Sequence, residues 1–249
     1  MAGDSPALPV RWCAERAEFG ARAADAVADA LAGNPGAVLA LPTGHTPLAL
    51  YAELARRCDA GQLDLAQARF FNLDEYLGLG ADHPLSYARF LRWHLLGPAR
   101  IPGNHVRLLQ GDAPDPDREC RAFDAAIEAA GGIDLAVLGL GVNGHIAFNE
   151  PGSDWQSRTR VVALDAQTRA VHRAQLGGAQ SVPDRGLTMG VATIRAARRI
   201  LLLVSGAAKQ QALDTLLLGA VDPRWPVTSL LGHPRLEVIA EAALRRSPE

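Results

Sequence analysis

The sequence contains few residues of the kind that mark disulfide-rich and metal-binding proteins. Its 249 residues include only three cysteines, Cys13, Cys58 and Cys120. The number is odd, and no two of them have the spacing of ligands in a metal site. We therefore expect free thiols in the reducing environment of the cytoplasm, and neither a disulfide framework nor a metal centre.

An excess of charge of one sign is also absent, as are long hydrophobic runs. The 25 Lys and Arg residues balance 27 Asp and Glu residues, for a net charge of −2, and the basic residues are scattered. The longest apolar runs, such as RILLLVSG at 199–206, are too short to cross a bilayer, and the first 20 residues lack the apolar stretch of a secretory signal. We expect a cytoplasmic protein that binds neither nucleic acid nor membrane.

What the sequence does contain is a hydrophobic fraction of 48%, in strand-length apolar segments that alternate with helical ones. Strands are predicted at 36–42, 68–76, 133–141, 197–206 and 236–244, and helices at 47–58, 84–96, 116–131 and 207–219. The alternation predicts a doubly wound, Rossmann-like α/β fold, in which a mainly parallel sheet carries helices on both faces in three layers. The length suits a single domain over residues 1–249.

The segment 152–185 is the least regular part of the chain. It is polar, rich in Arg, Gln, Ser and Asp, and separates two strong strand predictions. We expect it to form either a mobile flap or a surface excursion with a short helix.

Four polar loops follow four of the predicted strands. Their sequences are TGHTP (43–47), NLDEY (72–76), GVNGHIAFNEP (141–151) and SGAAK (205–209). In open parallel sheets, ligands bind outside the carboxyl ends of the strands. We therefore expect these loops to meet at one edge of the sheet and to form a binding site there.

The first of these loops has the features of an anion site. It contains Thr43, Gly44, His45 and Thr46 just before a predicted helix, where free backbone N–H groups and the helix dipole favour an anion. Gly44 would let a phosphate approach the backbone, and the threonines add hydroxyl groups. The alternative is a tight turn in which Thr46 caps the helix.

Two charged residues stand in the loops after other strands. Asp74 follows apolar residues in FNLDEY, and a carboxylate in apolar surroundings can have a raised pKa and act as a base. Lys209 lies just inside the helix after SGAAK and could reach a bound phosphate. The alternatives are a solvated acid in a turn and an exposed helix lysine.

The loop GVNGHIAFNEP holds an imidazole, a carboxylate and an amide within a few residues. His145 can shuttle protons near neutral pH, Glu150 can fix its ring and tautomer, and Asn143 can do so more weakly by hydrogen bonding. No second ligand stands at the spacing of a zinc site. The alternative is a histidine that caps a turn or packs in the core.

Several motifs occur in order between about residues 36 and 240: LALPTGHTPLALYAEL, FNLDEYLGL, HPLSYARFL, LGLGVNGHIAFNEPGS, SRTRVVAL, GLTMGVATI and LLLVSGAAKQQAL. Together they resemble the glucosamine-6-phosphate deaminase (isomerase) family. The pairing of GHIAFNEP with an upstream NLDEY is specific, because the related 6-phosphogluconolactonases lack both strings in this form.

The resemblance implies acid–base chemistry on an amino-sugar 6-phosphate, without metal or cofactor. It implies that His145 handles the protons of ring opening, oriented by Glu150 and the residue at position 143, and that Asp74 moves a proton from C2 to C1. Hydrolysis of the resulting imine would release fructose 6-phosphate and ammonia. The TGHTP loop and Lys209 would hold the phosphate.

The sequence departs from the family pattern at four places. Asn143 stands where an Asp is common, and His45 stands where the family usually has a small residue. Ala174 occupies the position of a phosphate-binding Arg, with Arg173 one residue earlier, and Val162 stands where regulated members carry a Lys. Val162 argues against allosteric control by an N-acetyl sugar phosphate.

Alternative functions use the same sheet. Galactosamine 6-phosphate differs from glucosamine 6-phosphate only at C4, so the motifs do not separate the two substrates. A 6-phosphogluconolactonase-like hydrolase and a non-catalytic sugar-phosphate sensor are the other hypotheses. The sequence is compatible with a monomer or a homo-oligomer.

Overall fold

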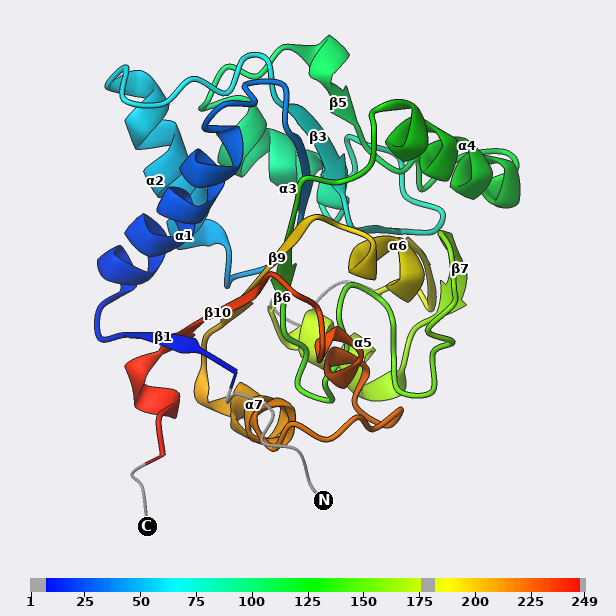
Figure 1. The fold of residues 1–249 in the computed structure, drawn as a ribbon. Coiled ribbons are helices and arrows are strands. Elements are labelled where there is room, and N and C mark those ends of the chain that lie inside the picture. The colour runs from blue at the N-terminus through cyan, green and yellow to red at the C-terminus, as the bar shows by residue number, and fades with distance from the viewer. Residues whose placement is uncertain (1–7, 176–181, 247–249) are drawn as a thin grey trace.

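The computed structural model describes residues 8–175 and 182–246, and its centre is a seven-stranded parallel sheet (Figure 1). The strand order is β1-β10-β9-β6-β2-β3-β5. The strands are β1 Val10–Cys13, β2 Val38–Leu41, β3 Arg69–Asn72, β5 Val106–Arg107, β6 Leu135–Gly139, β9 Arg199–Val204 and β10 Leu236–Glu241. Because every pair in this sheet is parallel, all strands end at the same edge.

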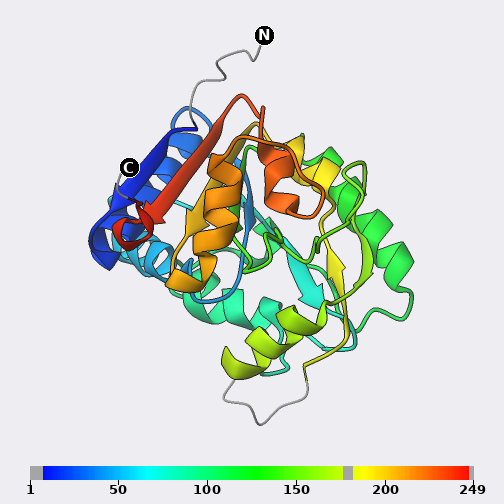
Figure 2. The ribbon, with the colours of Figure 1, turned by 90° about the horizontal axis from the view of Figure 1, so that it is seen from below.

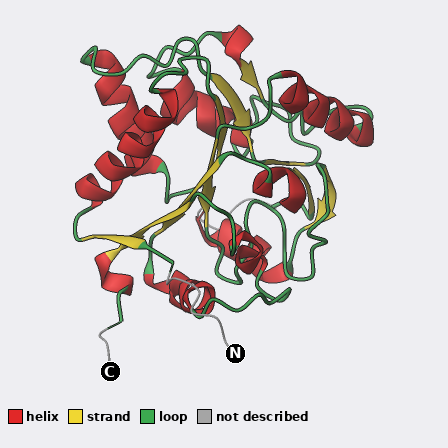
Figure 3. Cartoon of the chain, in the orientation of Figure 1, coloured by secondary structure: helices red, strands yellow, loops and turns green. Residues whose placement is uncertain are grey.

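Helices cover both faces of this sheet, as Figure 3 shows. One face carries α1 Arg16–Leu31, α2 Leu48–Asp59 and α3 Tyr87–Leu91, which continues as a π-helical turn Arg92–Leu96; the other carries α4 Pro116–Ala129, α6 Val191–Arg195 and α7 Gln210–Leu217. Alternation along β2 divides the core: Leu39 and Leu41 pack with the first set of helices, and Val38 and Ala40 with the second. The predicted three-layer, doubly wound fold is confirmed.

Short 3₁₀ helices complete the chain at Gly103–His105, Ala207–Lys209, Pro226–Leu230 and Ala242–Leu244. Within the described residues, no helix has both the length and the apolar character needed to cross a membrane.

A second, antiparallel sheet of three strands was not predicted. It consists of β4 Asp74–Tyr76, β8 Arg185–Thr188 and β7 Arg160–Ala163 in the order β4-β8-β7. The prediction of one strand over 68–76 is wrong, because the chain changes sheets at the buried Leu73. At this change the Leu73 N–H donates to Leu41 of β2, and the Leu73 carbonyl accepts from Met189. Asp74 therefore lies on a strand rather than in a loop.

The segment 152–185 is more regular than we expected. It contains β7, helix α5 Ala166–Gln175 and the first residue of β8, whereas 176–181 lie outside the described residues. Figure 2 shows α5 in yellow-green, near the turquoise α3. β7 could not be predicted from the sequence, because it is half-buried and lacks a clear apolar alternation. The mobility of this segment stays a prediction.

The N-terminal unit of β1 and α1 was also not predicted, and it reaches the binding edge. β1 pairs with β10 so that Cys13 lies opposite Glu241, the last residue of β10. Helix α1 then packs closely on α2, since a Cβ at Gly20 would lie 2.6 Å from the Ala49 carbonyl oxygen. These contacts hold the start of α1 at the carboxyl edge of the sheet.

Candidate active site

A cavity of about 770 Å³ opens at the carboxyl edge of the parallel sheet. It is bounded by the loops after β2, β6 and β9, by β4 and α3, and by α5. Seven of the predicted site residues line it: Thr43, Gly44, His45, Thr46, Asp74, His145 and Lys209. The other two, Asn143 and Glu150, lie behind His145 and contact it from there. The predicted convergence of the four loops is therefore present in the structure.

His145 is held by a small polar network. The Oδ1 atom of Asn143 accepts from the backbone N–H of His145 at 3.2 Å, and its Nδ2 donates to Glu150 Oε2 at 2.9 Å. The same Glu150 oxygen lies 3.4 Å from Nδ1 of His145. Asn143 thus fixes both the turn and the carboxylate, and this leaves the other face of the imidazole to the cavity.

Glu150 is ionised in this network. Burial alone would raise its pKa, but the hydrogen bond and charge of His145, with hydrogen bonds from Asn143 and Thr168, lower that pKa to about 2. A fixed negative charge beside Nδ1 stabilises the protonated imidazole. The arrangement can therefore accept a proton at His145 and release it again.

Helix α5 supplies two residues that the sequence analysis missed. Thr168 is buried, and its Oγ1 lies 3.3 Å from Nδ1 of His145. One helical turn later, His172 lines the cavity, with its Nδ1 2.6 Å from the hydroxyl of Tyr76. Burial and neighbouring His145 lower the pKa of His172 to about 4, so this imidazole is neutral near pH 7. The spacing of Thr168 and His172 by four residues, on one helix face, is the signal that could have identified them.

Asp74 presents its carboxyl group to the cavity from β4. It is 7% exposed, and no side-chain or backbone donor of the described residues contacts its carboxylate. Burial, with a smaller contribution from the charge of Glu75, raises the pKa of Asp74 well above its usual range. A buried carboxylate without donors is a stronger base than an exposed one, so Asp74 is suited to remove a proton from carbon.

Glu75 points to the other side of β4 and has a structural role. Its carboxylate accepts from the Ser86 hydroxyl at 2.8 Å and from the backbone N–H groups of Tyr87 and Ala88 at 3.0 and 2.9 Å. It therefore caps the first turn of α3. This cap fixes α3, which forms a wall of the cavity, relative to Asp74.

The TGHTP loop forms another part of the cavity lining. Gly44 has a φ of 91°, a backbone conformation that favours glycine. The alternative of Thr46 as helix cap is wrong, because Pro47 holds that position and the Thr46 hydroxyl instead accepts from Ser205 at 3.0 Å. His45 is exposed and lines the cavity rather than filling it.

Lys209 also lines the cavity, from the loop after β9. It lies in the 3₁₀ turn that precedes α7, one residue before the α-helix, and not inside that helix as predicted. Burial lowers the pKa of its amine. In contrast, Arg173 and Ala174 are exposed on α5 and do not line the cavity.

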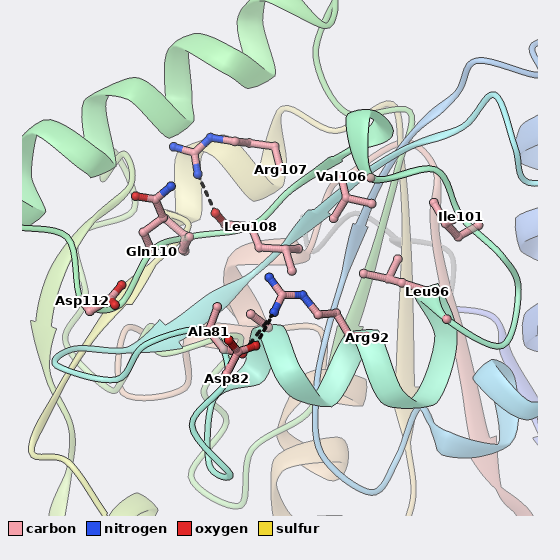
Figure 4. Close-up of a pocket in the computed structure, with 14 residues that line it drawn as sticks. Ala81, Asp82, Arg92, Leu96, Ile101, Val106, Arg107, Leu108, Gln110 and Asp112 are labelled. Carbon is pink, nitrogen blue, oxygen red and sulfur yellow. Dashed lines mark hydrogen bonds and ion pairs between the residues drawn. The ribbon is translucent and has the colours of Figure 1, made fainter.

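A second cavity of about 700 Å³ lies on the other side of α3 and its π-helical turn (Figure 4). Its two arginines are engaged, because Arg92 pairs with Asp82 at 3.0 Å and Arg107 pairs with Glu119 at 2.8 Å, and Asp112 is a further acidic residue of its lining. Apolar side chains line much of the remainder: Leu96, Ile101, Val106 and Leu108. It lacks a paired acid and base, so the first cavity is the candidate active site. In the described residues there is also no group of three side chains suited to hold a metal ion.

Comparisons with known proteins agree with this geometry. The family model described as glucosamine-6-phosphate isomerases/6-phosphogluconolactonase matches residues 14–238. The chain belongs to this family. Relatives named glucosamine-6-phosphate deaminase are 44% identical in Beutenbergia cavernae, over 92% of this chain and 88% of that protein, and 44% identical in Mycolicibacterium smegmatis, over 90% and 87%.

Solved structures of the glucosamine-6-phosphate isomerase/6-phosphogluconolactonase family have the same fold. The structure of a monomeric glucosamine-6-phosphate deaminase superposes with a TM-score of 0.92 at 36% identity, over 96% of this chain and all of that one. A 6-phosphogluconolactonase from Thermotoga maritima superposes with a TM-score of 0.75 at 18% identity, over 93% and 98%, and this likeness concerns the fold alone.

The close approach of Gly141 to His145 gives a test of the imidazole's position. A Cβ at residue 141 would overlap the His145 ring. We expect Gly141→Ala to lower kcat by about 10- to 100-fold, because the displaced ring no longer meets the substrate in register. Steady-state kinetics will measure this, with Gly103→Ala as the control, since no atom lies within 4 Å of the Cβ added there. Unchanged kcat in Gly141→Ala would show that the ring position is not critical.

Proposed function

We propose that this protein is a glucosamine-6-phosphate deaminase, which converts glucosamine 6-phosphate into fructose 6-phosphate and ammonia. One observation supports the proposal. The same cavity is lined by a carboxylate that receives no hydrogen bond (Asp74), by a histidine that lies beside a carboxylate (His145), and by a loop with the features of an anion site. The names of the relatives point to the same reaction.

His145 opens the sugar ring in this proposal. It moves protons between the ring oxygen and the C1 hydroxyl of the closed sugar, while Glu150 stabilises the protonated imidazole from Nδ1. Asn143 and Thr168 hold the carboxylate and the ring in place. Asn143 carries no charge, so the negative charge of the network resides on Glu150.

Asp74 performs the isomerisation step. The ionised carboxylate removes the proton from C2 of the open-chain sugar. The C2–H electron pair forms the C1=C2 bond of an enolamine, and the carbonyl electron pair moves to O1, which takes a proton from the protonated His145. Asp74 then returns the proton to C1, which leaves an imine at C2 that water hydrolyses to the ketone and ammonia. No cofactor is required, because every step is a proton transfer or an addition of water.

The loop Thr43–Thr46 and Lys209 hold the phosphate, which keeps the reacting carbons at the other end of the cavity in register. The segment 152–185 acts as a flap within the single domain 1–249. Its helix α5 already contacts His145 through Thr168 and Tyr76 through His172. Movement of α5 would admit the sugar, and its return would exclude water.

A coupled assay for ammonia tests this function. We expect purified protein to release ammonia from glucosamine 6-phosphate, and turnover in deuterium oxide to place solvent deuterium at C1 of the fructose 6-phosphate. The same assay with galactosamine 6-phosphate determines the preferred epimer. Turnover of a 6-phosphogluconolactone without ammonia release would favour a hydrolase, and calorimetric binding of the sugar without any product would favour a sensor.

A further inference from the structure

The phosphate end of the cavity contains an acidic residue as well as the basic one already described. Glu241, at the end of β10, lines the cavity there, and its carboxylate accepts from the backbone N–H of Gly206 at 2.8 Å. Lys209 comes from the same loop as Gly206, and burial lowers its pKa. A phosphate monoester carries close to two negative charges near neutral pH. One desolvated amine, in a cavity that a carboxylate also lines, is a poor match for such a group.

A second cation reaches this end from the other terminus of the chain. Arg16, the first residue of α1, lines the cavity, and its Nη2 donates to the backbone carbonyl of His45 at 3.3 Å. No carboxylate of residues 8–175 or 182–246 forms an ion pair with it. The single bond to His45 leaves the other guanidinium N–H groups free to bind a ligand.

The sheet itself places Arg16 there. β1 is parallel to β10, with Cys13 opposite Glu241, so the chain leaves β1 at the same edge where Glu241 binds Gly206. Arg16 follows three residues later. The packing of α1 on α2 then holds it against the loop that begins α2.

The basic residues of α5 do not supply a second cation to the phosphate end of the cavity. Arg169 and Arg173 do not line the cavity. His172 does, but its pKa of about 4 leaves it neutral near pH 7. Arg16 and Lys209 are therefore the arginine and lysine side chains that line this cavity in the described parts of the chain.

We propose that Arg16 binds the phosphate group of the substrate together with Lys209, so that the junction of β1 and α1 forms part of the phosphate site. The identity of the sugar rests on the function proposed above, whereas the recognition of phosphate by Arg16 does not. The guanidinium binds two phosphate oxygens from one side, and the Lys209 amine binds as a point charge from the other.

Replacement of Arg16 tests this assignment. We expect Arg16→Gln to raise KM for glucosamine 6-phosphate on the order of 10- to 100-fold, because one charge-assisted contact to the phosphate is lost. We expect kcat to change by no more than about twofold. Calorimetry should show the same loss for inorganic phosphate, which needs no turnover. Arg16→Lys should recover part of both.

Arg22→Gln is the matched control, because Arg22 lies on the same helix, pairs with Glu18 at 2.9 Å and does not line the cavity. We expect its KM and its phosphate affinity to equal those of the unchanged protein. Thermal unfolding of each variant identifies one that has lost the fold, and Arg16→Lys then carries the test.

Unchanged phosphate affinity in Arg16→Gln would overturn the assignment, and so would a lower kcat with unchanged KM. Failure of the proposed function looks different. In that case the unchanged protein releases no ammonia, yet phosphate affinity still falls in Arg16→Gln and not in Arg22→Gln.

Discussion

Asp74→Asn is expected to lower kcat by about 10²- to 10⁴-fold while substrate binding stays near normal. The amide has the shape of the carboxylate but cannot accept the C2 proton. The Asp74 carboxylate receives no hydrogen bond from the described residues, and the bond from Asn72 goes to the backbone carbonyl of Asp74, which the replacement leaves in place. The loss should therefore fall on proton transfer alone.

Three measurements check this prediction. Steady-state kinetics give kcat, calorimetry gives the affinity for the sugar phosphate, and deuterium incorporation at C1 reports the proton transfer itself. Asp112→Asn is a suitable control, because Asp112 lines the other cavity and should leave all three unchanged. A large rise in KM with kcat intact would contradict the assignment of Asp74 as the base.

The raised pKa of Asp74 also has a consequence for pH dependence. Only the ionised carboxylate acts as a base, so kcat/KM should rise with pH through the pKa of Asp74 and reach its plateau well above the ordinary value of 3.8. For stability the sign is opposite: an acid whose folded pKa is raised stabilises the fold at low pH and loses that contribution as pH rises. Near neutral pH, Asp74→Asn should thus unfold at an equal or higher temperature.

Glu150→Gln is the second change with a large expected effect. It preserves the size of the side chain and removes the charge that lies 3.4 Å from Nδ1 of His145. We expect kcat to fall by about 10²- to 10³-fold, because the protonated imidazole loses its counter-ion during ring opening.

Steady-state kinetics measure this fall in kcat. Glu128→Gln serves as the control, since Glu128 is an exposed carboxylate that pairs with Arg158 and lies outside the cavity. If Glu150→Gln retained the kcat of the unchanged protein, the negative charge would have no part in catalysis and Glu150 would be only a structural residue.

Those features of the fold and the site that depend on local pattern could be predicted from the sequence. The central strands are apolar runs of strand length, which indicate buried strands from the sequence alone. Asp74, His145 and Lys209 follow such runs directly. β4, β7 and β8 escaped detection because they are short and are defined by antiparallel partners far away in the sequence.

The same reason explains which residues of the site were missed. Thr168 and His172 reach the cavity only because α5 folds back over it, and Arg16 reaches it only because β1 pairs with β10. The spacing of Thr168 and His172 indicates that the two residues share one helix face, but not that this face covers the cavity. The pairing of β1 with β10, which brings Arg16 there, has no local signature in the sequence.

The small antiparallel sheet connects Asp74, the proposed base, to the proposed flap. Thr188 of β8 lies between Asp74 of β4 on one side and Arg160 of β7 on the other, and α5 leaves from β7 and returns to β8. The swing of α5 that we propose would therefore pull on β7 or β8 and shift the carboxylate of Asp74. We expect a substitution in β8, remote from the sugar, to alter both product release and the alignment of the proposed base.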